Sequence, residues 1–318
     1  MAPSSNIIAF GGTFFGAGTF PELQTPEDVQ KLLDLLKSKG CTKIDTAQLY
    51  GMGKSEEIIG QAKAIVQGFA IDTKWLGGWL GKPWATRETM VSSAKESLVK
   101  LGAGKGKEVD IFYIHSRDLQ TSFEETLKGV NEAYQPVKEV LEICKKNNYI
   151  MPSVYQGSYA AVARKAEDEL FPLLRENNFS FYAYSPIAGG FLTKNRKFVE
   201  EQQGRFNKDA RDGIYHKMYT KENFMSLLDD WEKIANEEGV SKAELAFRWI
   251  NYHSALDPAK GDGVIFGASK FAQVEATLQY LKNGPLKDSS AKQINALWDK
   301  VKNDSILDNF QAVFGGSA

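Results

Sequence analysis

Four side chains with complementary chemistry follow three predicted strands: Asp45, Tyr50, Lys74 and His115. Asp45 ends a short strand and Tyr50 lies five residues later in the turn, whereas Lys74 and His115 each end a later strand. A phenol with a pKa of about 10 donates a proton poorly at neutral pH, but a nearby ammonium favours the phenolate and lowers that pKa. A carboxylate can fix the lysine, and an imidazole can hold a substrate oxygen. The four groups therefore predict a site in which Tyr50 protonates a carbonyl oxygen while a hydride reaches the carbon.

Each of these residues also has an ordinary structural explanation. An aspartate after a strand often caps a helix or a turn, and a single tyrosine usually packs against apolar neighbours. A lysine at a strand end is commonly a surface charge, and a histidine is commonly a hydrogen-bonded packing residue. Their joint position at successive strand ends favours a site, because barrel enzymes keep their chemistry at that edge.

Short apolar runs alternate with amphipathic stretches along most of the chain, which predicts an α/β fold with a parallel sheet covered by helices. The length of 318 residues allows two average domains or one α/β barrel. No linker or low-complexity segment divides the chain, so residues 1–318 are predicted to form a single domain with a core at about 7–303 and a variable tail at 304–318. The predicted strands are residues 7–13, 41–45, 69–74, 109–115, 153–156, 179–184 and 263–267.

These strands number seven rather than eight. Between Leu127 and Cys144 the sequence predicts the end of one helix, a break at Gln135-Pro136 and the start of another helix, with no strand-like run. Residues 189–221 are rich in Gly, Asn, Lys and Arg, and they predict an irregular loop long enough to be functional.

Composition argues against several classes of function. The net charge of −1 provides no long-range attraction to nucleic acid or to an anionic membrane. No apolar run reaches the roughly 18–20 residues of a membrane span, and no signal peptide is evident. Two cysteines are no disulfide framework and predict reduced thiols in a cytoplasmic protein. No metal-ligand spacing, Rossmann glycine motif or paired glycosidase acids appear, so a metal centre, a Rossmann site and a barrel hydrolase are all disfavoured.

Six stretches of the sequence form an ordered set of motifs. They are residues 44–50 (IDTAQLY), 71–74 (IDTK), 109–115 (VDIFYIH), 152–156 (PSVYQ), 181–190 (FYAYSPIAGG) and 264–269 (VIFGAS). In this order they resemble motifs of the aldo-keto reductases, and the similarity is greatest to the branch of aflatoxin-aldehyde and succinic-semialdehyde reductases and their fungal relatives. The resemblance spans about residues 7 to 300, and all six motifs in order are far more specific than any one of them.

The resemblance implies a TIM (β/α)8-type barrel that reduces aldehydes or ketones to alcohols with NADPH. Tyr50 would donate the proton, Asp45 and Lys74 would tune it, and His115 would orient the carbonyl. The implied partners are a small-molecule carbonyl substrate and, as a possible homodimer, a second copy of the chain.

The resemblance also implies a set of cofactor contacts. Gln156 would bind the nicotinamide carboxamide and Tyr184 would stack on the ring. The cation of Lys270 suits the adenosine 2′-phosphate, which favours NADPH over NADH. Arg205 matches a loop arginine that can meet a substrate carboxylate, although a solvated loop charge explains it equally well. The remaining implied contacts are Ser185, Pro186, Ile187, Ala188, Gly189 and Lys194 near the pyrophosphate, and Ser269 and Gln273 beside Lys270.

One departure from the family pattern affects the whole barrel. Relatives carry a fifth strand, followed by a Ser-Asn pair that helps to hold the carboxamide, between the helices that here meet at Pro136. Losing a strand from a closed barrel leaves unpaired edges, so the barrel is expected to lack or distort its fifth strand. A splice form, an error in the gene structure and an impaired copy all fit this gap. The alternative function is therefore a catalytically impaired barrel that binds NADP(H) weakly and serves as a sensor or subunit.

Overall fold

Seven strands, paired in parallel, lie in the part of the chain that the structure describes. The structure is a computed structural model that describes residues 5–18, 20–77, 85–103, 108–116, 118, 121–122, 137–149, 151–210 and 213–314. The chain divides into two units, each described by itself. The N-terminal unit comprises Ile8–Ser153 and Gly267–Glu275, and the C-terminal unit comprises Met1–Ile7, Val154–Phe266 and Ala276–Ala318.

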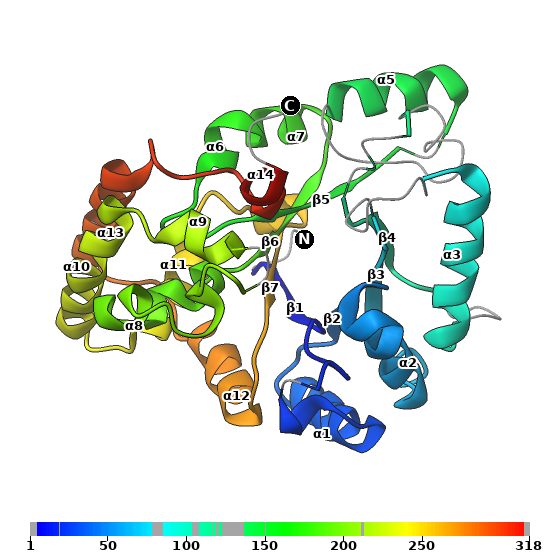
Figure 1. Cartoon of the computed structure of the whole chain (residues 1–318), viewed down its shortest axis with the longest axis horizontal. Coiled ribbons are helices and arrows are strands. Elements are labelled where there is room, and N and C mark those ends of the chain that lie inside the picture. Colours follow the sequence, from blue (N-terminus) through cyan, green and yellow to red (C-terminus); the bar gives the residue numbers. More distant parts are fainter. Residues whose placement is uncertain are drawn as a thin grey trace. The chain divides into compact units, whose positions relative to one another are not determined.

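Four strands build the N-terminal unit, in the order β4-β3-β2-β1. They are short and largely buried, as expected for parallel strands. Helices α1, α2 and α3 lie on one side of them (Figure 1). The strands are β1 (Ile7–Gly11), β2 (Lys43–Asp45), β3 (Ala70–Trp75) and β4 (Ile111–Ile114), and the helices are α1 (Pro26–Ser38), α2 (Lys54–Gln61), α3 (Arg87–Lys100) and α5 (Val137–Asn147), with 3-10 turns at Pro21–Leu23 and Tyr50–Gly53.

The register of β2 and β3 gathers charge on one face of the sheet. Asp45 lies opposite Asp72, and side chains two residues apart in a strand point to the same face. Lys43 and Asp45 of β2 therefore share a face with Asp72 and Lys74 of β3. Thr73 points the other way, toward α2.

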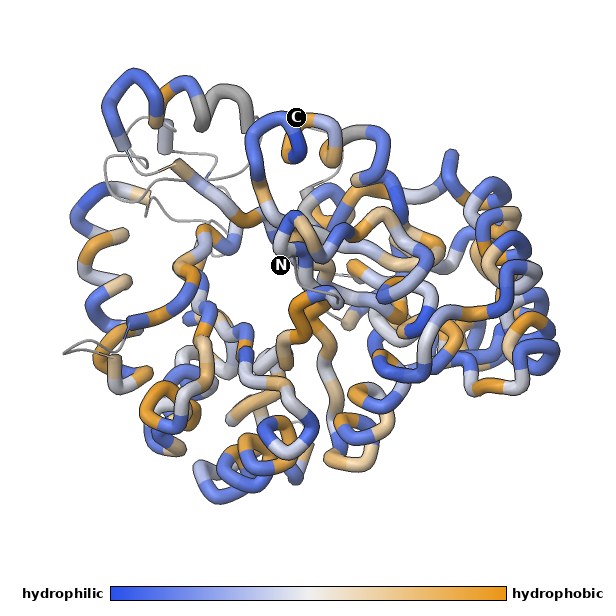
Figure 2. The backbone as a smooth tube through the Cα atoms, turned by 180° about the vertical axis from the view of Figure 1, so that it is seen from behind, coloured by the Kyte–Doolittle hydropathy of each residue, from blue (hydrophilic) through white to orange (hydrophobic). Residues whose placement is uncertain are grey.

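Local sequence signals explain where helices begin. Thr25 caps α1 in a capping box: its Oγ1 accepts the N–H of Asp28, and the Asp28 carboxylate accepts the N–H of Thr25. Thr86 caps α3 in the same sense by accepting the N–H of Thr89. The helices alternate between apolar and polar residues along the chain (Figure 2), and α1 buries Val29, Leu32, Leu33 and Leu36.

Three further strands and most of the helices form the C-terminal unit. Their order is β7-β6-β5, and α10 packs along α13 (Figure 1). The strands are β5 (Val154–Ser158), β6 (Ser180–Tyr184) and β7 (Gly263–Phe266). The helices are α6 (Lys165–Glu169), α7 (Phe171–Glu176), α8 (Arg196–Glu200), α9 (Ile214–Tyr219), α10 (Glu222–Glu238), α11 (Lys242–Tyr252), α13 (Asp288–Val301) and α14 (Asn309–Phe314), and α12 (Phe271–Tyr280) begins in the N-terminal unit.

The strand predictions are confirmed: an observed strand overlaps each of the seven predicted ranges, with β3 and β5 extending one and two residues beyond theirs. This α/β fold agrees with a TIM-type barrel that lacks or distorts one strand. The predicted break at Gln135-Pro136 lies outside the described residues. Between β4 and β5 the described residues contain α5 and no strand, and residues 123–136 are not among them.

The segment between β5 and β6 forms two helices, α6 and α7, because Pro172 at the start of α7 cannot continue the first one. One prediction about the C-terminal unit needs correction. The loop expected over residues 189–221 is largely ordered. Its described residues form α8, α9 and two 3-10 turns, Ala188–Thr193 and Gly204–Phe206. Buried aromatic rings organise this segment, namely Phe191, Phe206, Tyr215 and Tyr219.

No helix among the described residues is both long and apolar enough to cross a membrane.

Candidate active site

A buried ion pair joins the ends of β2 and β3 in the N-terminal unit. The Nζ of Lys74 lies 2.6 Å from Oδ2 of Asp45 and donates a second hydrogen bond, of 2.8 Å, to the carbonyl oxygen of Thr46. The side chains of Lys74 and Asp45 are only 2% and 3% exposed. Burying two charges costs free energy unless both are paired and hydrogen-bonded, and this pair meets that condition.

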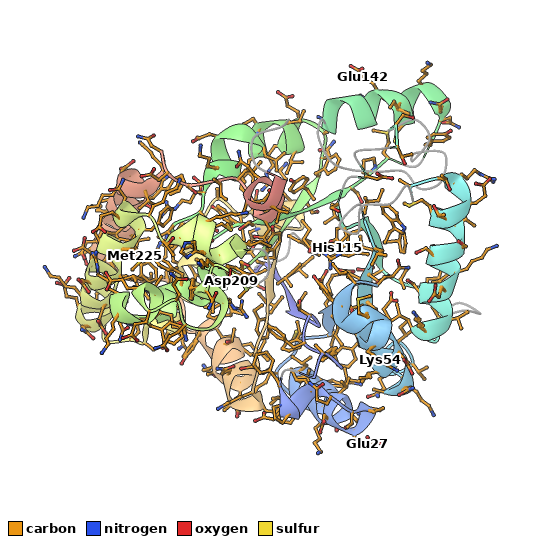
Figure 3. The ribbon with its side chains drawn as sticks, in the orientation of Figure 1. Glu27, Lys54, His115, Glu142, Asp209 and Met225 are labelled. Carbon is orange, nitrogen blue, oxygen red and sulfur yellow. The ribbon has the colours of Figure 1, made fainter. Side chains whose placement is uncertain are left out.

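The rings of Tyr50 and His115 lie next to that ion pair. Their centroids are 5.5 Å apart and their planes are nearly perpendicular, at 85°. The Nζ of Lys74 is 5.2 Å from the centroid of the Tyr50 ring. His115 follows β4 directly (Figure 3). The structure therefore brings together all four residues that the sequence singled out for proton transfer.

Burial and neighbouring charge set the protonation states of two members. Burial alone would lower the pKa of Lys74, but the charges of Asp45 and Tyr50 outweigh it and raise the pKa, so the ammonium persists. Burial, helped by the positive charge of Lys74, lowers the pKa of His115 to about 3. His115 is thus a neutral imidazole at neutral pH and can donate one hydrogen bond while carrying no charge.

A strained turn holds Tyr50 in place. Gly51, Met52 and Gly53 have φ angles of 57°, 54° and 90° in succession. A Cβ on Gly51 would lie 2.9 Å from the carbonyl oxygen of Phe15, so this position requires glycine. The conformation of Met52 is uncommon for a non-glycine residue, and such strain is concentrated at functional sites.

Gln48, which sequence reasoning did not single out, ties this turn to α3. Its Nε2 donates to the carbonyl oxygen of Ser93 at 2.9 Å and to Oγ of Ser97 at 2.7 Å. Its Oε1 accepts the N–H of Leu76 at 3.0 Å and the hydroxyl of Ser93 at 2.6 Å. A polar residue between Asp45 and Tyr50 was the available signal, but its partners lie over 25 residues away in sequence.

The C-terminal unit holds several residues predicted to contact a cofactor. Gln156 lies in β5 and Tyr184 ends β6. Burial, reinforced by the charge of Asp308, raises the pKa of Tyr184 well above its usual value, so its phenol is neutral. Hydrogen bonding to the backbone of Asn309, the first residue of α14, lowers this pKa, but by less than burial and Asp308 raise it.

The turn after Tyr184 has an unusual backbone. Ser185, Ala188 and Gly189 have φ angles of 58°, 52° and 64°, and Pro186 and Ile187 lie between them. Successive turns of this kind can point N–H groups at an anion. Gly189 also packs tightly, because a Cβ there would lie 2.0 Å from the Tyr215 ring.

Two cations predicted to meet ligands lie over aromatic rings of the same unit. The Nζ of Lys194 is 4.6 Å from the centroid of the Phe198 ring. The guanidinium of Arg205 is 5.1 Å from the centroid of the Tyr215 ring. Cation–π contacts of this kind orient a side chain without neutralising its charge.

The segment before α12 belongs to the N-terminal unit. Both the N–H and the hydroxyl of Ser269 lie 3.0 Å from Oε1 of Gln273, and Lys270 is exposed. Sequence reasoning missed Glu22, whose carboxylate accepts the N–H of Phe271 at 2.7 Å at the start of the helix. A phosphate bound there would meet the exposed cation and the positive end of the helix dipole, but also this carboxylate.

Across the described ranges no three His, Cys, Asp or Glu side chains form a group that could hold a metal ion.

Comparison with known proteins identifies the family. The sequence matches the aldo/keto reductase family over residues 8–299. The chain belongs to the aldo/keto reductase family. It is 36% identical to an aldo-keto reductase of Pseudocercospora fijiensis, over 85% of this chain and 97% of that protein. It is 32% identical to the oxidoreductase sirO of Leptosphaeria maculans (95% and 97%), and 34% identical to the human aflatoxin B1 aldehyde reductase member 4 (82% and 85%).

Each match to a fungal relative is longer than the number of residues of this chain that it covers. The match to the Leptosphaeria protein is 324 residues long, whereas 95% of 318 residues is about 302. The match to the Pseudocercospora protein is 291 residues long, whereas 85% of 318 residues is about 270. In both cases about 20 positions of the match, in total, have no counterpart in this chain.

Proposed function

We propose that this aldo/keto reductase uses NADPH to reduce an aldehyde or ketone to an alcohol, with Tyr50 as the proton donor. Membership of the family supports an oxidoreductase that reduces carbonyl compounds. The observation that carries the proposal is the buried Asp45–Lys74 pair, whose ammonium lies 5.2 Å from the centroid of the Tyr50 ring.

The four side chains divide the work of proton transfer. Asp45 fixes Lys74, and the persistent ammonium favours the phenolate that Tyr50 becomes when it gives up its proton. His115 is neutral and orients the carbonyl oxygen by donating a hydrogen bond. The chain thus supplies a positioned acid and a fixed positive charge where negative charge develops.

The cofactor contacts are part of the same proposal. NADPH supplies the hydride when bound. Gln156 and Tyr184 would hold its nicotinamide, and the turn of Ser185, Pro186, Ile187, Ala188 and Gly189, with Lys194, would hold its pyrophosphate. Lys270, with Ser269 and Gln273, would bind the 2′-phosphate; the exposed cation supports this assignment.

Arg205 would meet a carboxylate on the substrate, and its position over the Tyr215 ring, 5.1 Å from the centroid, supports this assignment. We place the enzyme in the cytoplasm, with a homodimer as a possible assembly.

The test is the oxidation of NADPH, followed by absorbance, with a carboxyl-bearing aromatic aldehyde. Tyr50→Phe should lower turnover by at least about a hundredfold, because general acid catalysis contributes roughly that much. Binding of NADPH, followed by its fluorescence, should be unchanged in this variant. A Tyr50→Phe protein that turns over at the wild-type rate would disprove the role of Tyr50.

A second candidate is a catalytically impaired barrel that binds NADP(H) weakly and acts as a sensor or subunit. The observation that favours it is the absence of about 20 positions that both fungal relatives have. A folded wild-type protein that binds NADPH without oxidising it in the presence of aldehydes would select this candidate.

A further inference from the structure

We propose that Asp72 is a positioning residue for Tyr50: its buried carboxylate sets the net charge beside the Asp45–Lys74 pair and thereby the strength of Tyr50 as a proton donor. This inference rests on the proposed function. It assigns a fifth residue to the proton-transfer machinery and makes the reaction sensitive to pH.

The position of Asp72 brings it onto the face that carries the site. It lies opposite Asp45 in the register of β2 and β3, and it is two residues before Lys74 in the same strand. Its side chain is 0% exposed. Successive same-face residues in a strand stand next to one another, so Asp72 is a direct neighbour of the ion pair.

The ammonium of Lys43 pairs with two acids, Asp72 and Asp110. The Nζ of Lys43 lies 2.7 Å from Oδ1 of Asp72 and also hydrogen-bonds to the carboxylate of Asp110, which is 51% exposed. Oδ2 of Asp72 is buried, and no side chain or backbone group among the described residues hydrogen-bonds to it. A buried carboxylate with half of its acceptor capacity unused is poorly stabilised in its charged form.

The four buried charged groups of β2 and β3 balance only when Asp72 is ionised, counted without the half-exposed Asp110. From β2, Lys43 and Asp45 face it. Lys74 follows it in β3, and Asp110 precedes β4. With Asp72 ionised, the four buried groups of β2 and β3 sum to zero; with Asp72 protonated, they carry one net positive charge. Tyr113 lies opposite Lys74 in β4, with the centroid of its ring 5.6 Å from the Nζ of Lys74.

Asp72 changes its charge in the physiological range. Burial raises its pKa to about 7, against the opposing effect of Lys43 and with smaller contributions from Asp45 and Asp110. Asp72 in turn contributes to the raised pKa of Lys74. The carboxylate is therefore coupled to the charge that acts on Tyr50.

The direction of the effect follows from electrostatics. Below pH 7 Asp72 is neutral, the net positive charge favours the phenolate, and Tyr50 is the stronger acid. Above pH 7 its negative charge offsets part of the Lys74 field and Tyr50 becomes the weaker acid. Proton donation to the carbonyl should thus be faster on the acid side of an inflection near pH 7.

The first experiment measures hydride transfer in a single turnover, with NADPH already bound, from pH 5.5 to 8.5. The wild-type rate should fall about threefold to tenfold through pH 7, since one unit of Tyr50 pKa corresponds to tenfold. Asp72→Asn keeps the shape of the side chain and its hydrogen bond to Lys43. It should abolish the inflection and keep, at every pH, the faster rate that the wild-type protein shows below pH 7.

Two variants at the partners of Asp72 act as matched controls. Asp110→Asn removes the competing acid on Lys43 and should move the inflection to lower pH. Lys43→Gln removes the ammonium and should move it to higher pH. An inflection that stays unchanged in Asp72→Asn would overturn the proposal.

The second experiment needs neither cofactor nor activity. In cofactor-free protein carrying tyrosine labelled with 13C at Cζ, the Tyr50 resonance is identified by its absence in Tyr50→Phe and titrated by NMR. Asp72→Asn should ionise Tyr50 at a pH lower by about half a unit to one unit, because the negative charge of Asp72 is absent. An identical Tyr50 titration in both proteins refutes the inference, even if the wild-type protein shows no turnover and the proposed function fails.

Discussion

At the scale of single residues, the site depends on which groups are charged. Sequence analysis assigned Asp45, Tyr50, Lys74 and His115 to strand ends or the turns after them, because each one ends or closely follows an apolar run. Asp72 was missed, although it stands two residues before Lys74 in a buried strand, which places both on one face. Its charge depends on Lys43, which lies 29 residues from Asp72 and 67 residues from Asp110 along the chain.

His115 makes the stability of the protein sensitive to acid. The pKa of His115 is about 3 in the folded chain and 6.5 in the unfolded chain. Between pH 3 and pH 6.5 the unfolded chain therefore binds one more proton than the folded chain. Stability from this residue is complete above pH 6.5 and is lost as the pH falls toward 3. At pH 5 the loss should be about 1–2 kcal/mol.

Urea unfolding of the wild-type protein and of His115→Gln at pH 7 and pH 5 measures this loss. The wild type should lose more free energy of unfolding than the variant between the two pH values. Asp72 acts in the opposite direction, because its raised pKa makes the folded chain bind the extra proton, and this contribution is common to both proteins. Equal losses in the two proteins would contradict the assignment of a neutral, buried His115.

At the scale of elements, strands were easier to predict than the segment over residues 189–221. Parallel strands buried on both faces appear as continuous apolar runs. The segment over residues 189–221 buries isolated aromatic rings such as Phe191 and Phe206, which are separated by polar residues with no helical or strand period. Only their packing against one another and against Tyr219 organises the short helices there.

The turn around Gly189 offers a test of this packing. Gly189→Ala should lower the free energy of unfolding by about 1–3 kcal/mol more than Gly204→Ala. Both glycines have left-handed φ angles, 64° and 58°, so the backbone strain is matched. A Cβ at Gly189 meets the Tyr215 ring at 2.0 Å, whereas at Gly204 the nearest atom is 3.9 Å away.

Chemical denaturation of the two variants provides the comparison. If they lost equal stability, the close contact between Gly189 and Tyr215 would carry no energetic weight. Because Gly189 lies in the turn proposed to hold the pyrophosphate, Gly189→Ala should also weaken NADPH binding, while Gly204→Ala should not.

At the scale of the whole molecule, the seven-strand pattern was readable from the sequence, and so was the absence of an eighth strand-like run. Which strands pair across such a gap is decided by contacts between segments far apart in the chain, which no local sequence pattern encodes.

NADPH should stabilise the whole protein against heat. A ligand that binds only the folded state at a hundred times its Kd adds about 2.7 kcal/mol, which for a chain of this size corresponds to a rise in Tm of a few degrees. NADH at the same concentration should raise the Tm less, because it lacks the 2′-phosphate proposed to meet Lys270.

Thermal unfolding with each nucleotide, in wild-type protein and in Lys270→Ala, tests the preference. In Lys270→Ala, NADPH and NADH should raise the Tm by nearly equal amounts. Lys282→Ala, which removes a lysine further along the same segment of the chain, is the control. Equal stabilisation by both nucleotides in the wild type would remove the basis for NADPH selectivity.

The buried pair of Asp45 and Lys74 also limits how this sequence can drift over generations. Losing either partner leaves an uncompensated buried charge, which costs about 3–5 kcal/mol, a large share of the roughly 5–15 kcal/mol that stabilises a typical protein. Selection for folding alone would therefore retain both residues, even in a lineage that no longer reduced carbonyls. Tyr50 and His115 leave no buried charge behind when they are replaced, so a lineage released from catalysis would change at those two positions first.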